Sequence, residues 1–256
     1  MDLNNIAQAA AELAQRRSLK TNVTTPLAPA LTPLNLDHAL AIQQATASLR
    51  NDDIAAWKCL QPLAQNKPIV APIFADTLQQ GEACQIILSS QGQAQIEPEI
   101  AFILDQDFAP RGTPYTEQEV CDAISHCHMA LELMQFRFDE TIDFYTKLAD
   151  CLVNQGLYLG PVIDTKQALQ ASKIDIIYQQ GSDSQCVSGQ HPNALPQQPL
   201  FWLVNHLTAR GITLRAGQAV ITGSYAGIIN VKPNLTTRIE YQGLGTIETC
   251  FVPLKN

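Results

Sequence analysis

The sequence lacks the features that mark several large classes of protein. It has no Cys-x-x-Cys pair, and its seven cysteines are an odd number, so a disulfide framework and a zinc ribbon are excluded. It has no apolar run near the roughly 18 residues that a membrane span needs. It begins without the basic and apolar segments of a secretory signal. These absences predict a soluble protein of a reducing, cytoplasmic compartment that does not enter the membrane.

Clusters of lysine and arginine are also missing. The formal net charge is −8, which argues against a nucleic-acid partner, because binding to a phosphate backbone requires grouped basic residues. Hydrophobic residues make up 46% of the chain and charged residues only 16%, as in a globular protein. The acidic balance is compatible with the recruitment of a cation.

The order of predicted elements has no internal repeat and no regular alternation of strand and helix. Helical patterns occur at 3–17, 36–49, from 117, at 167–172 and at 199–209. Strand patterns occur at 54–60, 84–89, 95–104, 130–138, 158–163, 174–179, 218–222, 237–241 and 246–252, while 61–82 and 181–198 read mainly as loops. This order predicts an α+β fold with a helical N-terminal arm at 1–55 and a β-rich catalytic domain at 56–256. Within the arm, residues 21–33 are rich in Thr and Pro and are expected to be extended.

Two glutamates, Glu97 and Glu99, bracket Pro98 inside an otherwise apolar run. Because side chains alternate along a strand, both carboxylates are expected on the same face, where their like charges repel. A divalent cation would turn that repulsion into binding, and Mg²⁺ is often held by a few carboxylates. Glu132 lies in a similar apolar segment and is a candidate third ligand. The alternative is a solvated edge strand with an exposed helical acid at 132.

Other polar residues allow more than one interpretation. Lys58 interrupts an apolar strand, so it is either buried with a partner or placed with its ammonium group in solvent. His126 and His128 alternate without further ligands at a typical spacing, which favours ordinary core or surface histidines. Gly243 and Gly245 lack the third glycine of a dinucleotide-binding motif. The turn that begins at Gly223 allows a backbone approach to a ligand.

Several segments together resemble the 2-keto-4-pentenoate hydratase/4-oxalocrotonate decarboxylase family, within the fumarylacetoacetate hydrolase superfamily. They are Trp57-Lys58, Ile96-Glu-Pro-Glu-Ile-Ala-Phe102, Ala130-Leu-Glu-Leu133 with Arg137, Ala149-Asp150, Gly217 and Thr222-Gly-Ser224. The resemblance covers nearly the whole chain. It implies a mixed β-roll or sandwich core of the type found in the C-terminal domain of that superfamily, with peripheral helices. It also implies turnover of small unsaturated 2-oxo or 2-hydroxy-dienoic acids from aromatic-compound degradation.

The resemblance also implies roles for individual residues. It places the ligands of a Mg²⁺ or Mn²⁺ ion at Glu97, Glu99 and Glu132. It makes Lys58 and Asp76 the candidate catalytic residues for proton transfer. Ser224 and Arg137 are the candidates for binding the substrate. After Lys58 the chain reads Cys59-Leu-Gln-Pro62, where the family usually has Ile-Gly-Leu-Thr, so the segment expected to wrap the substrate is altered.

Three functions remain open at this point. The first is a metal-dependent hydratase (a lyase) acting on 2-hydroxy-2,4-dienoates, and the second is a decarboxylase acting on 4-oxalocrotonate-like 2-oxo acids. The third is a non-catalytic homologue that serves as a partner subunit. A C–C hydrolase is disfavoured because no histidine lies between Gln61 and Gly81 to activate water. A homo-oligomer is expected, with a sister hydratase or decarboxylase as a further partner.

Overall fold

The computed structural model describes residues 1–19, 24–50, 52–62, 67–138 and 141–254. Its helices are α1 (Leu3–Ser18), η1 (Pro29–Leu31), α2 (Leu36–Arg50), η2 (Ala75–Thr77), α3 (Glu117–Asp122), α4 (Phe144–Ala149), η3 (Cys151–Val153), α5 (Thr165–Gln170) and α6 (Gln198–Thr208). Its strands are β1 (Ile54–Leu60), β2 (Ile69–Phe74), β3 (Leu78–Gln79), β4 (Ala83–Ile86), β5 (Ala94–Leu104), β6 (Ile124–Met134), β7 (Asn154–Ile163), β8 (Lys173–Gln180), β9 (Asp183–Gln190), β10 (Ala219–Ile221), β11 (Ile229–Val231), β12 (Thr236–Tyr241) and β13 (Gly245–Pro253).

A mixed sheet of eight strands forms the centre of the molecule. Its strands follow the order β2-β1-β10-β5-β6-β7-β3, and β11 adds to β5. The pair β1 and β10 is parallel, whereas β5 and β6 are long antiparallel neighbours. One face of this curled sheet is lined by small and branched apolar residues, including Ala56, Ala101, Ala130, Ala219 and Ile221. Small side chains on that face let strands from both halves of the sheet approach one another.

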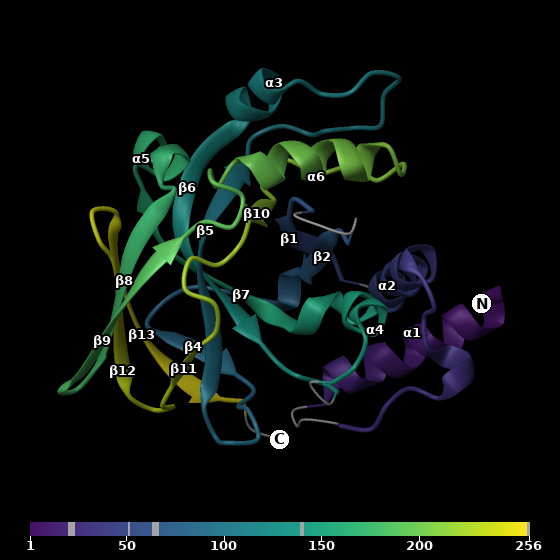
Figure 1. Cartoon of the computed structure of the whole chain (residues 1–256), viewed down its shortest axis with the longest axis horizontal. Helices are drawn as coiled ribbons and strands as arrows, with labels where there is room; N and C mark the ends of the chain where they lie inside the picture. Colours follow the sequence, from purple (N-terminus) through teal and green to yellow (C-terminus); the bar gives the residue numbers. More distant parts are fainter. Residues whose placement is uncertain (20–23, 51, 63–66, 139–140, 255–256) are drawn as a thin grey trace.

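The opposite face of the large sheet packs against a second sheet. This five-stranded sheet has the order β4-β13-β12-β8-β9. The two sheets share a continuous core that includes Ile100, Phe102, Leu131 and Phe251. Burial of this many large apolar side chains is the main stabilising contribution to the fold. Figure 1 shows β8, β9, β12 and β13 on the left of the large sheet.

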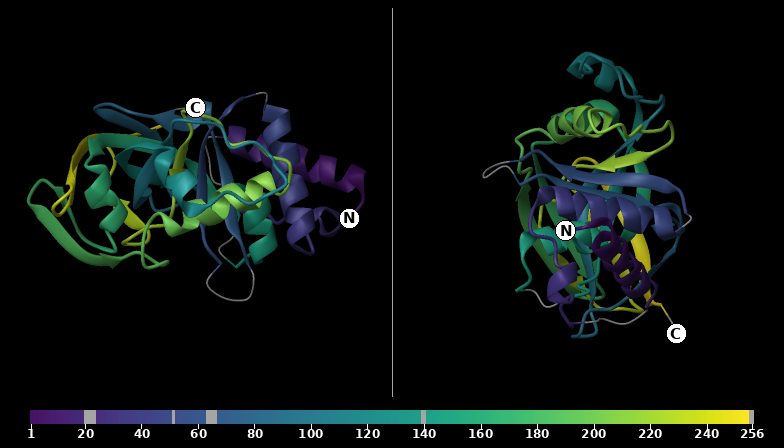
Figure 2. Two further views of the ribbon diagram at one scale, coloured as in Figure 1. Left: turned by 90° about the horizontal axis from the view of Figure 1, so that it is seen from above. Right: turned by 90° about the vertical axis from the view of Figure 1, so that its right-hand side faces the viewer.

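Helices α1, α2 and α4 lie on the side away from the second sheet (Figures 1 and 2). They form their own apolar cluster, to which Ala9, Leu13, Ile42 and Leu148 contribute. The Asp2 side chain caps α1 by accepting a hydrogen bond from the backbone N–H of Asn5, as N-cap residues commonly do. None of the described helices is both long and apolar enough to cross a membrane.

The structure confirms the α+β class and most of the predicted elements. The capping box at Thr116 begins α3 at Glu117 as expected, and Glu132 lies in a strand rather than a helix. The expectation that 61–82 is mostly loop is wrong, because β2 and β3 lie there. Pro72 is tolerated since β2 is an edge strand, where a missing N–H breaks no ladder. Strand β9 was missed because its sequence is almost entirely polar, and residues 21–23 of the predicted arm lie outside the described residues.

Candidate metal centre

Three glutamates from two neighbouring strands converge at one place. In the β5–β6 ladder Glu97 lies opposite Glu132, and Glu99 lies opposite Ala130. One carboxylate oxygen of each glutamate lies within 4.8 Å of the others. Glu99 and Glu132 are buried and Glu97 is half-buried. The two-residue spacing on β5 and the antiparallel register therefore place all three acids on the face that carries Ala101 and Ala130.

Lys58 reaches the same cluster from β1. It lies two residues after Ala56 and so points to the same face of the sheet. Its Nζ lies 2.6 Å from Oε1 of Glu132 and 3.5 Å from the carbonyl oxygen of Leu152. Only 8% of the residue is exposed. Of the two interpretations of the sequence, the buried lysine with an acidic partner is correct.

The backbone after β10 supplies another hydrogen bond to the cluster. The N–H of Gly223 donates to Oε2 of Glu99 at 2.6 Å. Gly223 has a φ of 122°, and a Cβ there would lie 2.8 Å from Cδ1 of Leu60. A side chain would therefore strain the turn and crowd Leu60. The predicted approach of this turn to a ligand becomes, in the structure, an approach to one of the three acids.

The cluster contains three acidic side chains and one lysine, so its charges do not balance. Burial, and then the charge of Glu132, raises the pKa of Glu97 to about 7 even though Lys58 opposes the shift. Burial and the charges of Glu132 and Glu97 raise the pKa of Glu99 well above its usual value. Burial alone would lower the pKa of Lys58, but the glutamate charges outweigh it and raise that pKa. One ammonium group therefore does not neutralise three buried carboxylates.

The residues present fit a hard divalent cation. Oε2 of Glu132 is buried and has no hydrogen-bond partner among the described residues, which is costly for a carboxylate oxygen unless a cation is bound there. Oε1 of the same group is engaged by Lys58 and by Nδ2 of Asn154 at 2.9 Å. Three carboxylates without nitrogen or sulfur donors suit Mg²⁺ or Mn²⁺. These two ions were the ones expected from the sequence.

The other predicted site residues lie in different surroundings. Ser224 is beside the cluster, because its Oγ donates at 3.3 Å to the carbonyl oxygen of Pro98. Asp76 lies in η2, between β2 and β3, where its carboxylate forms an ion pair with Arg50 and its backbone N–H donates to Asp52. These described contacts do not include Lys58 or the three acids.

Arg137 is buried behind the cluster. Its side chain is 1% exposed and forms an ion pair with Asp150 at 2.9 Å. Nη1 donates to Gln135, and Nη2 donates to the carbonyl oxygens of Asp150 and Asn154. The guanidinium therefore contacts protein groups with all three nitrogens, and its predicted contact with substrate has no support in these contacts.

Sequence reasoning missed Asn154 and His191. Asn154 is fully buried and holds Glu132, as described above. His191 is 1% exposed, and its Nε2 lies 3.0 Å from the carbonyl oxygen of Thr222, next to Gly223. The available signal for Asn154 was a polar residue at the start of a strand that neighbours β6. Nothing local marked His191, because its contact with Thr222 joins residues 31 positions apart.

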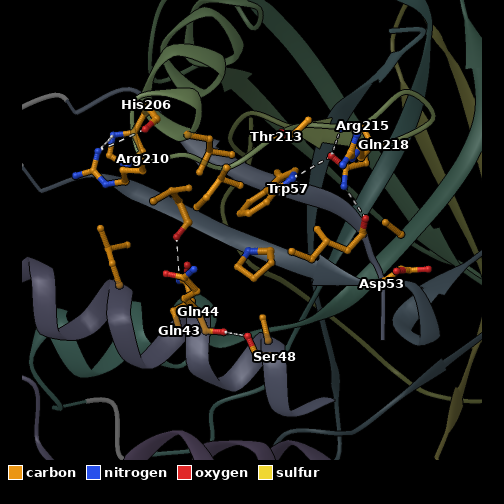
Figure 3. A pocket seen from close by; sticks show the side chains of 18 of the residues that line it. Gln43, Gln44, Ser48, Asp53, Trp57, His206, Arg210, Thr213, Arg215 and Gln218 are labelled. Carbon is orange, nitrogen blue, oxygen red and sulfur yellow. Dashed lines mark hydrogen bonds between the residues drawn. The ribbon is translucent and has the colours of Figure 1, made fainter. Parts of the chain in front are cut away.

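A large cavity lies on the other face of β1, where Trp57 points. It has a volume of about 1030 Å³ and lies between α2 and the end of α6 (Figure 3). Several of its polar groups bond to the protein: Nε1 of Trp57 donates to Gln218, and Gln43 donates to the carbonyl oxygens of Val70 and Leu148. Nε2 of His206, another lining residue, is buried without a hydrogen-bond partner among the described residues. The cavity is separate from the acidic cluster, because consecutive residues of a strand face opposite sides.

Comparisons with known proteins agree with this geometry. No family model matches the chain. It is 28% identical over 239 residues to the 2-keto-4-pentenoate hydratase of Paraburkholderia xenovorans (strain LB400), covering 88% of this chain and 87% of that protein. It superposes with a TM-score of 0.80 on 4-oxalocrotonate decarboxylase from Pseudomonas putida G7, complexed with magnesium and adipate, at 17% identity, covering 98% and 99% of the two chains.

A more distant structure shares part of the fold. Fumarylpyruvate hydrolase from Pseudomonas aeruginosa, in complex with Mn²⁺ and pyruvate, superposes with a TM-score of 0.56 at 16% identity, covering 78% of this chain and 89% of that one. The predicted fold, that of the fumarylacetoacetate hydrolase superfamily with added N-terminal helices, is thereby confirmed.

Proposed function

We propose that this chain is a metal-dependent hydratase of 2-hydroxy-2,4-dienoates. It belongs to the 2-keto-4-pentenoate hydratase/4-oxalocrotonate decarboxylase family of the fumarylacetoacetate hydrolase superfamily. The observation that carries the proposal is the convergence of Glu97, Glu99 and Glu132 within 4.8 Å. The hydratase at 28% identity supports the choice of reaction. The substrate would be a small dienoic acid produced in aromatic-compound degradation.

Glu97, Glu99 and Glu132 would hold the ion in this proposal. A bound Mg²⁺ or Mn²⁺ would supply a Lewis acid that stabilises negative charge developing on a substrate oxygen, an effect worth several kcal/mol. The Gly223 N–H fixes one oxygen of Glu99. Asn154 fixes one oxygen of Glu132.

Lys58 is the proposed proton-transfer group. It is an ammonium in the metal-free site because three acids raise its pKa. An ion held by those acids would weaken the cause of that shift, and burial, which opposes it, would then favour a lower pKa of Lys58, as general acid-base catalysis requires. Asp76 and Arg137 are left out of the proposed mechanism because their described ion pairs are with Arg50 and Asp150, outside the cluster. Ser224 remains a candidate for contact with the substrate.

The organisation of the protein is part of the same proposal. The division into an arm at 1–55 and a catalytic domain at 56–256 stays a prediction from the sequence, since the apolar cluster of α1 and α2 also includes Leu148 and Ala149 of α4. The cytoplasmic location and the assembly into oligomers stay predictions from the sequence.

The test measures turnover directly. Loss of ultraviolet absorbance of 2-hydroxypenta-2,4-dienoate should require Mg²⁺ or Mn²⁺ and should disappear in Glu97→Gln. The matched control is Glu248→Gln, because Glu248 is an exposed acid on β13. Release of CO₂ from 4-oxalocrotonate, measured in parallel, would assign the decarboxylase instead. Metal binding without turnover of either acid would favour a non-catalytic partner subunit.

A further inference from the structure

The segment between α4 and β7 has an unusual backbone. Cys151, Leu152 and Val153 are consecutive non-glycine residues with φ values of 55°, 54° and 57°. Residues with a Cβ rarely occupy this left-handed region, and a β-branched residue such as Val153 is especially disfavoured there. Such a backbone persists only when surrounding contacts hold it, and it is often found at functional sites.

Arg137 supplies contacts at both ends of this left-handed turn, and the backbone N–H of Gln135 adds one to the carbonyl oxygen of Val153 at 2.9 Å. Nη2 of Arg137 donates to the carbonyl oxygen of Asp150 at 3.2 Å and to that of Asn154 at 2.7 Å. These two carbonyls flank the turn on either side, so one guanidinium group bridges its ends. The Asp150 carboxylate accepts from Nε of Arg137 at 2.9 Å with both oxygens. Both side chains are almost completely buried.

Two groups in or next to the turn contact the acidic cluster and Lys58. The Leu152 carbonyl accepts from Nζ of Lys58 at 3.5 Å. The Asn154 amide donates to Oε1 of Glu132 at 2.9 Å. Asn154 is fully buried, so its side chain has little freedom to compensate if the backbone moves. The orientation of Glu132, and therefore the direction in which its unpartnered Oε2 points, depends on the conformation of the turn.

We infer that Arg137 is a positioning residue of the metal centre. It acts through the left-handed turn and Asn154 on Glu132, and it does not bind the substrate. The inference rests on the proposed metal centre and adds to it a group that none of the three carboxylates touches directly. Residues that orient a metal ligand in this way typically change metal affinity by roughly 10- to 100-fold when they are replaced.

The first test is a Mn²⁺ titration followed by electron paramagnetic resonance, which needs no substrate. Arg137→Lys keeps the positive charge but cannot bridge two carbonyls and a carboxylate with one ammonium group. Its Mn²⁺ dissociation constant is expected to rise roughly 10-fold or more. Arg238→Lys is the matched control, because Arg238 forms a surface ion pair with Glu240, and it should bind as the wild type does. An unchanged dissociation constant in folded Arg137→Lys overturns the inference.

A double-mutant cycle separates positioning from general loss of structure. Asn154→Ala removes the amide that contacts Glu132 but leaves Arg137 in place. The double variant carries both Arg137→Lys and Asn154→Ala. If Arg137 acts through Asn154, its Mn²⁺ dissociation constant should be close to that of whichever single variant binds Mn²⁺ less tightly, because the two changes interrupt one chain of contacts. If the fold-changes in the dissociation constant of the two single variants multiply in the double variant, Arg137 acts by another route and the inference is overturned.

Folding is controlled separately. Circular dichroism and the thermal melting temperature of each variant are measured with chelator present, so that metal affinity is compared only between folded proteins. If Arg137→Lys does not fold, Asp150→Asn is tested in its place, since it keeps the size of the side chain, removes the charge that faces Arg137 and Arg17, and leaves one oxygen to accept from Nε of Arg137. It is expected to weaken Mn²⁺ binding about 10-fold, and unchanged binding would reject the inference. Failure of the wild type itself to bind Mn²⁺ would instead contradict the proposed function.

Discussion

The two faces of β1 differ in how their polar groups are satisfied. On one face Lys58 meets three acids, and Oε2 of Glu132 is left without a partner among the described residues. On the other face Trp57 lines a cavity of about 1030 Å³ whose buried glutamines are bonded to the protein. Nε2 of His206 on the cavity face also lacks a partner among the described residues, but burial lowers the pKa of His206 to about 4, so this group is a neutral imidazole rather than a charged carboxylate. Uncompensated buried charge is the better guide here, because a protein rarely retains it without a cation or a reaction to serve.

Substitutions on the two faces of β1 are expected to differ most in their effect on the rate of turnover. Glu132→Gln keeps the shape of the side chain and removes the charge of the most buried acid. Metal-dependent turnover of 2-hydroxypenta-2,4-dienoate should fall about 1000-fold, since Lewis-acid stabilisation is worth several kcal/mol. Initial rates at saturating Mn²⁺ measure the effect. If the variant kept more than a tenth of the wild-type rate, the acidic face of β1 would not be the site of turnover, and the cavity face would become the better candidate.

The next effect concerns stability without metal. Lys58→Met removes the buried cation that opposes three carboxylates, and loss of one partner of a buried pair typically costs about 3–5 kcal/mol. The free energy of unfolding in urea with chelator, at pH 8, should fall by at least about 3 kcal/mol. Added Mn²⁺ should recover part of the loss. Equal stability of the variant and the wild type would mean that the charges on this face are already balanced.

These two predictions rest on features that the sequence itself made visible. Alternation along β5 placed Glu97 and Glu99 on one face, and the apolar neighbours of Glu132 predicted its burial. The pairing of Glu97 with Glu132 then followed only from the register of β5 and β6, which a single sequence does not specify. The lysine was ambiguous for the same reason, because its partner lies 74 residues away.

Other parts of the site depend on tertiary structure alone. Asp76 was a candidate through the resemblance alone, and its ion pair with Arg50 joins residues 26 positions apart, which a single sequence does not specify. Arg137 was a candidate for substrate binding through the resemblance, but in the structure it forms a buried ion pair with Asp150. The left-handed backbone at Cys151, Leu152 and Val153 carries no glycine that would predict it.

A smaller effect is expected from pH. Burial lowers the pKa of His191 to about 4, although its hydrogen bond to Thr222 opposes the shift. Its ordinary pKa is about 6.5, so His191 is neutral in both states above that value and stability is full there. As the pH falls from 6.5 toward 4 the unfolded chain takes up the proton first, and stability is lost, by at most about 3 kcal/mol.

The His191→Gln variant measures this contribution. Glutamine can still donate to the Thr222 carbonyl, so the turn before Gly223 is retained while the titration is removed. Unfolding free energies between pH 7 and pH 4 should fall less steeply than in the wild type. His206, whose pKa is also lowered to about 4, by burial and then by Arg210, should keep some acid sensitivity in the variant. Identical slopes would show that His191 does not titrate as described.

The smallest effect is expected on the cavity face. Gln44→Ala changes a residue of α2 that lines the cavity (Figure 3) and touches neither Lys58 nor the acids in the described contacts. Turnover and the Mn²⁺ dissociation constant should each stay within about twofold of the wild type, as expected for a surface substitution away from the site. A larger change would link the two faces of β1 functionally and would require the cavity to be included in the site.

The most direct measurement is anomalous diffraction from crystals grown with Mn²⁺. The account predicts one strong anomalous peak in contact with carboxylate oxygens of Glu97, Glu99 and Glu132, and its loss in crystals of Glu132→Gln. A peak elsewhere, or no peak with the three side chains still clustered, would contradict the claim that these acids form a metal centre.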